Sequence, residues 1–209
     1  MRGERNPGVL TFFMKGLSLS AGMIVSIGSQ NAHVLRMGLR REHVALTVLI
    51  CIACEALLIL TGVAGMGRLV AASPVLLTAA RWGGALFLSW YGLRSWQAAW
   101  RGESLRAERG GIALTGRQAA GSVLAVTLLN PHVYLDTVIL LGAIGGQMPG
   151  SGKYWFAGGA IANAVIWFTA LGFGARLLAP VFARPRAWRV LDSLIGGIML
   201  MLAWGLVAA

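Results

Sequence analysis

The chain of 209 residues has little charge, because charged residues make up 12% of it, whereas soluble domains carry about 25%. Hydrophobic residues make up 57% of the chain, and the mean hydropathy is +0.72. Several segments reach the roughly 17 to 25 apolar residues that a helix needs to cross a bilayer. This composition leaves no room for a soluble domain and predicts an all-α polytopic membrane protein.

Acidic residues are scarce, because 7 Asp and Glu stand against 18 Lys and Arg and give a net charge of +11. In a soluble protein this balance would suggest a nucleic-acid partner. Here the basic residues lie between apolar segments, where their expected partners are anionic headgroups and their expected location is the cytoplasmic side. We therefore expect the lipid bilayer, and no nucleic acid, as a partner.

Cysteine is rarer still, since Cys51 and Cys54 are the only two. No second pair is available for a metal site or a disulfide framework, and we expect neither a metal nor another cofactor. Both residues lie in an apolar segment and are interpreted as small buried packing residues. The alternative is a membrane enzyme or electron carrier that passes disulfides through this pair, which would require accessible thiols.

Long polar connections are also lacking, with one exception at residues 100–118. This linker divides the chain into a first repeat, residues 1–99, and a second repeat, residues 119–209. Each half has room for three spans. We expect these spans to be helices, because lipid cannot satisfy unpaired backbone N–H and C=O groups. The six predicted spans are residues 9–32, 44–67, 74–96, 119–143, 153–178 and 189–208.

The start of the chain has the basic and apolar parts of a signal peptide. Its apolar run is interrupted by Lys15 and has no clear cleavage site, so we expect a retained first span. The connections after the first, third and fifth spans carry twelve Lys and Arg, and the opposite side carries six. Because positive residues favour the cytoplasm, we expect residues 100–118 inside and both termini outside.

The two halves resemble each other in sequence. Three pairs of matching motifs occur in the same order, and their offset grows from 99 to 108 to 113 residues, as small insertions after a duplication would give. Because each half has an odd number of spans, the copies would be inverted, as in many secondary transporters. The pairs are Asn31-Ala-His33-Val34 with Asn130-Pro-His132-Val133, Thr61 and Arg68-Leu69 with Thr169 and Arg176-Leu177, and Gly83-Gly84 and Tyr91-Gly92-Leu93 with Gly196-Gly197 and Trp204-Gly205-Leu206.

Small residues recur along the first, second and fifth predicted spans, among them Gly16, Ser20, Gly62, Gly159 and Gly172. Such residues let helix backbones approach closely in lipid. The glycine-rich segment GVAGMG has no following Lys-Ser or Lys-Thr, so a phosphate-binding loop is a poor interpretation.

Polar residues interrupt the apolar sequence at equivalent places in the two halves. Pro131 removes a backbone donor and predicts a helix break that only protein or a water-filled cavity could surround. The ends of broken helices, together with the amides of Gln30, Asn31 and Asn130, would suit a zwitterionic ligand. The alternative is that these amides only join helices to one another.

Two carboxylates, Glu55 and Asp136, lie within apolar sequence. An acidic group near the centre of a bilayer costs about 2.5–3.5 kcal/mol, so each should face the protein interior, where it could bind a cation or a proton. Asn163 aligns with Glu55 in the repeat and joins the candidate substrate site. The alternative is a structural ion pair of Glu55 with Arg81, unless Arg81 extends to the outer headgroups.

His33 and His132 form a matched pair in the two repeats. Because imidazole titrates near neutral pH, both join Glu55 and Asp136 as candidates for proton coupling. Packing histidines are the alternative interpretation.

Asp192 lies at the start of the last predicted span, close in sequence to Arg186 and Arg189. We interpret it as part of a solvated ion pair. It is therefore not counted among the candidate site residues.

Three segments resemble the LysE family of bacterial amino-acid exporters: SLSAGMIVSIGSQNAHVLRMGLRREHV near the start, TLLNPHVYLDTVILLGAIG in the middle and RWGGALFLSWYGL between them. The resemblance covers essentially the whole chain. It implies a bacterial plasma-membrane carrier, not an enzyme, that expels basic amino acids such as lysine and arginine. The driving force would be the proton gradient or the membrane potential.

The resemblance also implies which residues form the site. Gln30 and Asn31 match the family motif of the first span, and Asn130-Pro131 with Asp136 match that of the fourth. Glu55 departs from the pattern, because the family pattern has a Ser-Asp pair where this chain has Cys54-Glu55. The longer side chain puts the exact substrate in doubt more than the transport function.

Several alternatives remain open at this point. The substrate could be another small amino acid or a cationic metabolite. A polar channel or a purely structural subunit would have a similar composition. The sequence also leaves self-association into a homo-oligomer open.

Overall fold

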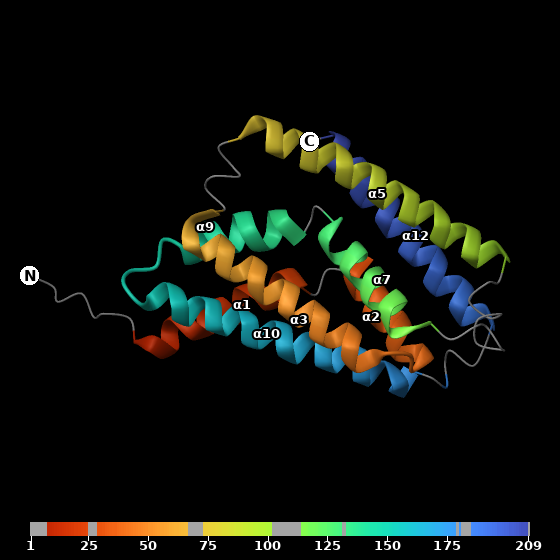
Figure 1. Cartoon of the computed structure of the whole chain (residues 1–209), viewed down its shortest axis with the longest axis horizontal. Helices are drawn as coiled ribbons and strands as arrows, with labels where there is room; N and C mark the ends of the chain where they lie inside the picture. The colour runs from red at the N-terminus through yellow and green to blue at the C-terminus, as the bar shows by residue number, and fades with distance from the viewer. Residues whose placement is uncertain are drawn as a thin grey trace, which may run out of the picture.

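The computed structural model describes residues 8–24, 29–66, 73–101, 114–130, 133–178, 180 and 185–208. Every regular element within these residues is a helix, as the sequence predicts (Figure 1). The elements are α1 (Val9–Ile24), α2 (Ser29–Arg40), α3 (Val44–Thr61), η1 (Gly62–Met66), α5 (Pro74–Arg101), α7 (Gly116–Leu128), η2 (Tyr134–Leu141), α9 (Gly142–Gly145), α10 (Gly152–Gly174), η3 (Ala175–Leu178) and α12 (Pro185–Ala208).

The two halves have the same order of elements. Each begins with two helices separated by a short interval, α1 and α2 in the first half and α7 and η2 in the second. Each continues with a long helix that ends in an irregular turn, α3 with η1 or α10 with η3, and closes with another long helix, α5 or α12. A duplicated chain would have this order, while the inverted relation of the two repeats stays a prediction.

Three helical segments of the described chain are long and apolar enough to cross a membrane: Val44–Gly65, Gly152–Leu178 and Arg186–Gly205. They coincide within a few residues with three of the predicted spans. α1 and α2 would make a fourth span as a bent pair, because their axes differ by 81°. The count of six spans therefore stays a prediction.

The first predicted span, residues 9–32, is wrong in its shape and its end. α1 stops at Ile24, and α2 runs in another direction as far as Arg40. The Asn31 side-chain amide donates a hydrogen bond to the Ile24 carbonyl oxygen at 2.6 Å. In a continuing helix, a backbone N–H of the next turn would donate to the Ile24 carbonyl. Here the Asn31 side chain takes its place.

The fourth predicted span begins earlier than expected, because α7 starts at Gly116 and not at residue 119. Thr115 and Gln118 form a capping box, in which each side chain bonds the backbone N–H of the other. α7 ends at Leu128 and η2 begins at Tyr134. The predicted break at Pro131 falls outside the described residues, and so do His132 and most of the linker.

α1 and α10 run parallel, in very close contact. A Cβ atom added at Gly16 would overlap the Phe156 carbonyl, and one added at Gly159 would overlap the Phe13 carbonyl. Glycine at these positions therefore lets the two helix backbones approach more closely than any other residue would allow, as the sequence predicts.

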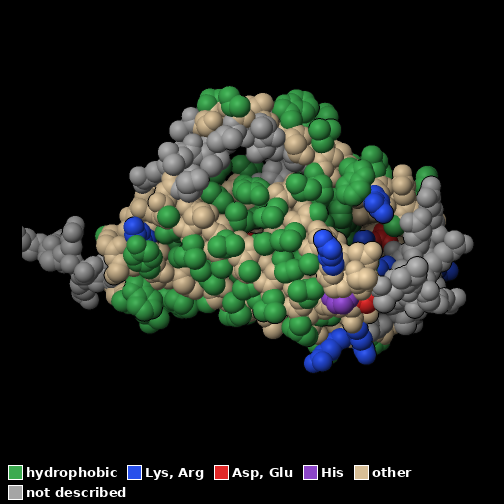
Figure 2. All heavy atoms as spheres, viewed as in Figure 1, with side chains coloured by type: hydrophobic (Ala, Val, Ile, Leu, Met, Phe, Trp, Pro, Cys, Tyr) green, Lys and Arg blue, Asp and Glu red, His purple; other side chains and the backbone are tan. Residues whose placement is uncertain are grey.

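α5 and α12 form an antiparallel pair that lies along one side of the molecule (Figure 1). Their backbones meet at Gly92 and Gly196, and the Trp96 indole N–H donates to the Ser193 carbonyl at 3.0 Å. Hydrophobic side chains cover the middle of the face shown in Figure 2, and Lys and Arg gather mainly at one end. An apolar band of this kind suits contact with lipid rather than water.

Candidate functional site

A cavity of about 370 Å³ lies between the two halves of the chain. This volume falls within the range of roughly 300–1,000 Å³ that is usual for ligand pockets. Five of the six predicted substrate residues line it, namely Gln30, Asn31, Glu55, Asn130 and Asp136. The structure therefore brings together residues that lie up to 106 positions apart in the sequence.

Both carboxylates predicted from the sequence face this cavity. Glu55 on α3 is 6% exposed, and one of its oxygens accepts a hydrogen bond from the Thr137 hydroxyl at 3.0 Å. Thr137 follows Asp136 on η2, so the two acidic groups approach the cavity from different halves. No lysine or arginine is among the described residues that line it, and the cavity is acidic.

Gln30 also faces the cavity. Its side chain is 6% exposed and lines the cavity, and it interacts with the Cys51 thiol on α3. Its Nε2 makes no hydrogen bond to nitrogen or oxygen within the described chain. A thiol is a weak acceptor, so an oxygen acceptor on a ligand would be a stronger partner for this amide.

Asn31 is already engaged at both ends of its amide. Its Nδ2 donates to Ile24 of α1, and its Oδ1 accepts from the Trp167 indole at 3.1 Å. Its first role is thus to hold the α1–α2 break against α10. Asn130 is 3% exposed and borders the cavity at the corresponding place in the second half.

A similar side-chain hydrogen bond joins η2 to the end of α7. The Tyr134 hydroxyl donates to the carbonyl of Leu128, the last residue of α7, at 2.9 Å. In each half, therefore, a side chain of the second helix bonds the carbonyl of the last residue of the first helix. Ile24 and Asn130, which lie near these helix ends, both line the cavity.

Asn163, the sixth predicted substrate residue, does not line the cavity. It is 8% exposed, and its Nδ2 donates to the Ser20 hydroxyl at 3.1 Å. Ser20 does line the cavity and in turn donates to the Ala160 carbonyl at 3.4 Å. Asn163 thus reaches the cavity only through Ser20.

The structure does not bring His33 to the carboxylates. His33 is buried and lines a separate cavity, where its Nε2 lies 3.3 Å from the Ser122 hydroxyl. The Arg81 side chain is not among those described, so a pair between Arg81 and Glu55 stays a prediction.

The two cysteines are free thiols buried in the protein. Cys51 is fully buried in a cluster with Val34 and Phe168, and Cys54 is 8% exposed. Thiol exchange needs access to a partner, so this arrangement does not favour a disulfide carrier.

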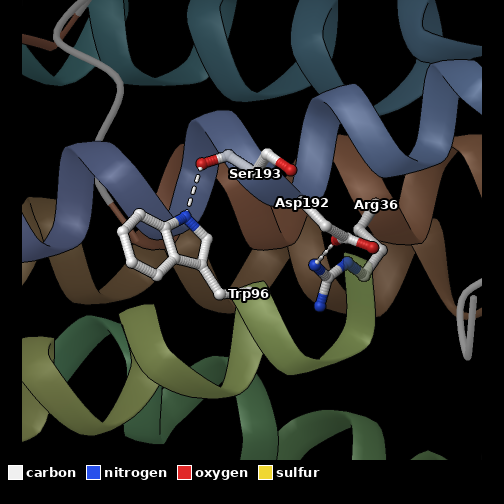
Figure 3. A network of polar contacts seen from close by, with 4 residues as sticks. All are labelled: Arg36, Trp96, Asp192 and Ser193. Atoms are coloured by element: carbon white, nitrogen blue, oxygen red, sulfur yellow. Dashed lines mark hydrogen bonds and ion pairs between the residues drawn. The ribbon is translucent and has the colours of Figure 1, made fainter. Parts of the chain in front are cut away.

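The interpretation of Asp192 as a solvated residue is wrong. Asp192 is fully buried and forms an ion pair with Arg36 of α2, 156 positions away (Figure 3). The local arginines were poor guides, because the helix turns Asp192 away from solvent and towards α2. The pair connects the first half of the chain to α12.

Two residues that line the acidic cavity, and the buried Asp192, are not identified as such from sequence. For Ser20 the sequence indicates only a packing role, and Thr137 has no signal other than its position next to Asp136. Asp192 carried the same signal as Glu55 and Asp136, since it too is a carboxylate followed by an apolar run. That signal could have identified it as buried.

Comparison with known proteins gives a consistent result. The model of the family described as LysE type translocator matches residues 21–209. A protein of Yersinia enterocolitica named arginine exporter protein ArgO is 41% identical over 198 residues, which cover 95% of this chain and 97% of that protein. Proteins of the same name from Serratia proteamaculans and from an Enterobacter strain are each 38% identical, over 94% and 95% of this chain and 98% and 94% of their own lengths. No solved structure matches the chain.

Proposed function

Because the chain belongs to the LysE type translocator family, we propose that it exports a cationic amino acid, arginine or lysine, across the bacterial inner membrane. The observation that carries this proposal is the cavity between the halves, which presents two carboxylates and no basic side chain among the described residues that line it. Buried negative charge is costly in a membrane. A cationic substrate would offset that cost.

The chemistry of the cavity suggests how the substrate is held. Its ammonium or guanidinium group would bind Glu55 and Asp136, and its carboxylate would accept a hydrogen bond from Gln30. The methylene groups of the side chain would lie against Ile198, Met201 and Leu202 of α12. Asn163 would act by positioning Ser20.

The electrical work of export favours coupling to protons. Moving one positive charge outward across a membrane that is negative inside costs about 2.3 kcal/mol per 100 mV. Exchange of one cationic substrate for one proton moves no net charge and avoids this cost. Glu55 and Asp136 are the groups that we expect to bind substrate and proton in turn.

The cavity also has the arrangement that alternating access needs. Residues from both halves line it, so a change in the angle between the halves would open it first to one side and then to the other. The inverted relation of the repeats would make the two open states similar in energy.

The test is efflux of radiolabelled arginine and lysine from proteoliposomes with an imposed pH gradient. Glu55→Gln and Asp136→Asn should each reduce efflux at least tenfold, since each removes a charge that the substrate needs. Glu42→Gln is the matched control, because Glu42 lies in the turn after α2 and outside the cavity; it should leave efflux unchanged. Citrulline, the neutral isostere of arginine, should not compete.

The outcome also separates the remaining alternatives. Unchanged efflux in both cavity variants, or equal competition by citrulline, would contradict a cationic substrate. Flux that does not saturate would indicate a channel. Loss of efflux in a Cys51→Ser, Cys54→Ser double variant would favour thiol chemistry.

A further inference from the structure

A second cavity, of about 480 Å³, lies between α2, α5 and α7, and its chemistry is opposite to that of the first. Arg36 and Arg40 line it from α2, and Arg94 lines it from α5. No carboxylate is among the described side chains that line it. A cationic amino acid would be repelled here, so this basic cavity calls for a different occupant from the acidic one.

One of these arginines makes an ion pair within the described residues. Asp192 is buried behind Arg36 and forms an ion pair with it. The wall of the cavity itself presents three guanidinium groups and, among the described side chains, no carboxylate. Such a wall attracts an anion.

Two buried donors in the basic cavity lack acceptors. The Nε of Arg36 and the hydroxyl of Tyr91 are both shielded from solvent, and neither makes a hydrogen bond within the described chain. Both residues line the cavity. Unsatisfied buried donors are uncommon in proteins, and two of them at one basic cavity point to an acceptor-rich ligand.

The remaining wall of the basic cavity is aromatic. The ring of Phe87 lies 6.1 Å from those of Trp90 and Tyr91, and the Arg94 guanidinium lies 5.5 Å from the Trp90 ring. Trp90 is 54% exposed on the outer face of α5, where lipid would contact it. The site thus combines cationic donors with an apolar surface that leads to the bilayer.

We propose that the basic cavity binds a phosphate group, and that its aromatic wall suits the phosphate of an anionic phospholipid. Arg40 and Arg94 hold the phosphate oxygens from opposite walls, and Tyr91 donates to one of them. Basic pockets between membrane helices commonly take lipid headgroups in this way. The proposal does not depend on the identity of the transported substrate.

The test uses the full chain, purified and delipidated in detergent. Binding of phosphatidylglycerol is compared with that of phosphatidylcholine carrying the same acyl chains, by native mass spectrometry and by the shift in melting temperature. Phosphatidylglycerol should bind saturably and at least fivefold more tightly. Equal binding of both lipids, or of neither, would overturn the proposal.

Variants locate the binding. Arg94→Gln and Arg40→Gln should each weaken phosphatidylglycerol binding at least fivefold, and Tyr91→Phe should weaken it about twofold or more. Arg117→Gln is the matched control, because Arg117 is exposed on α7 and lies outside the cavity. If the cavity variants bind as tightly as the unmodified chain while remaining folded by circular dichroism, the site lies elsewhere and the proposal is wrong.

A soluble probe identifies the source of the phosphate. Glycerol 1-phosphate carries the same group without acyl chains. Competition only at concentrations far above those of phosphatidylglycerol would assign the site to lipid. Equal potency would assign it to free phosphate compounds, and in both cases the phosphate site itself is supported.

Discussion

Glu55 illustrates how a single buried residue is controlled by its neighbour. Its carboxylate is held by the Thr137 hydroxyl, which comes from the other half of the chain. Hydrogen bonds to charged groups contribute about 1.5–3 kcal/mol. The position of the carboxylate, and its fit to a cation, therefore depend on this one donor.

We predict that Thr137→Val, which keeps the shape and removes the hydroxyl, raises the KM for arginine export roughly tenfold, because 1.4 kcal/mol corresponds to a factor of ten. Initial rates of efflux from proteoliposomes measure the effect. Thr61→Val is the control, since Thr61 is exposed on α3 and its hydroxyl, within the described chain, bonds the nearby Leu58 carbonyl. An unchanged KM would show that Thr137 does not position Glu55.

The Arg36–Asp192 pair leads to a prediction about stability. Removing one partner of a buried ion pair costs about 3–5 kcal/mol, because it leaves the other charge unpaired. Asp192→Leu should therefore lower the melting temperature in detergent by roughly 6–20 °C. The double variant Arg36→Met, Asp192→Leu should recover most of the loss, since no charge is left unpaired. A double variant as unstable as the single one would argue against this explanation.

These residues also show what the sequence can and cannot predict about a site. The rule that a carboxylate in apolar sequence must face the interior correctly predicts that Glu55 and Asp136 face a cavity. For Asp192 the nearby Arg186 and Arg189 favour a solvated ion pair instead. The true partner, Arg36, is 156 positions away, and no local pattern encodes that contact.

At the scale of elements, the sequence predicts one helix break, at Pro131, and misses another. Pro131 predicts irregular backbone in the second half. The 81° bend between α1 and α2 contains no proline and was not predicted. Its geometry depends on the contacts of Asn31 with Ile24 and Trp167, which join three separate helices.

The contact of α1 with α10 leads to the next prediction. A Cβ at Gly159 would overlap the backbone of Phe13, so Gly159→Ala should push the two helices apart and lower the melting temperature. Gly22→Ala is the control, because a Cβ there would meet nothing within 4 Å, and alanine is the better helix former by about 1 kcal/mol. Thermal unfolding in detergent distinguishes the two. Equal stability of both variants would show that α1 can move without cost.

At the scale of the whole molecule, the all-helical composition was predictable from hydropathy, while the division into two three-helix repeats stays a prediction. Apolar length was a good guide to α3, α10 and α12. It was a poor guide to α1 and α2, because a bent pair and a straight helix can have the same apolar length. Three-dimensional contacts decide between them.

The orientation in the membrane gives a prediction at this scale. The excess of Lys and Arg in the connections after the first, third and fifth spans predicts that both termini lie outside. Alkaline phosphatase, which is active only outside the cytoplasm, should therefore be active when fused after Ala209. Green fluorescent protein at the same position should be dark. The reverse pattern would invert the topology.

The cavity between the halves has a consequence for how ligand and protein support each other. Because Glu55 belongs to one half and Asp136 to the other, a molecule that bridges them binds only when the halves are assembled. By mass action, a ligand at 100 times its Kd stabilises the assembled state by about 2.7 kcal/mol. The bound substrate therefore stabilises the contact between the two halves. After release of the substrate, the free energy that holds the halves together is at its lowest.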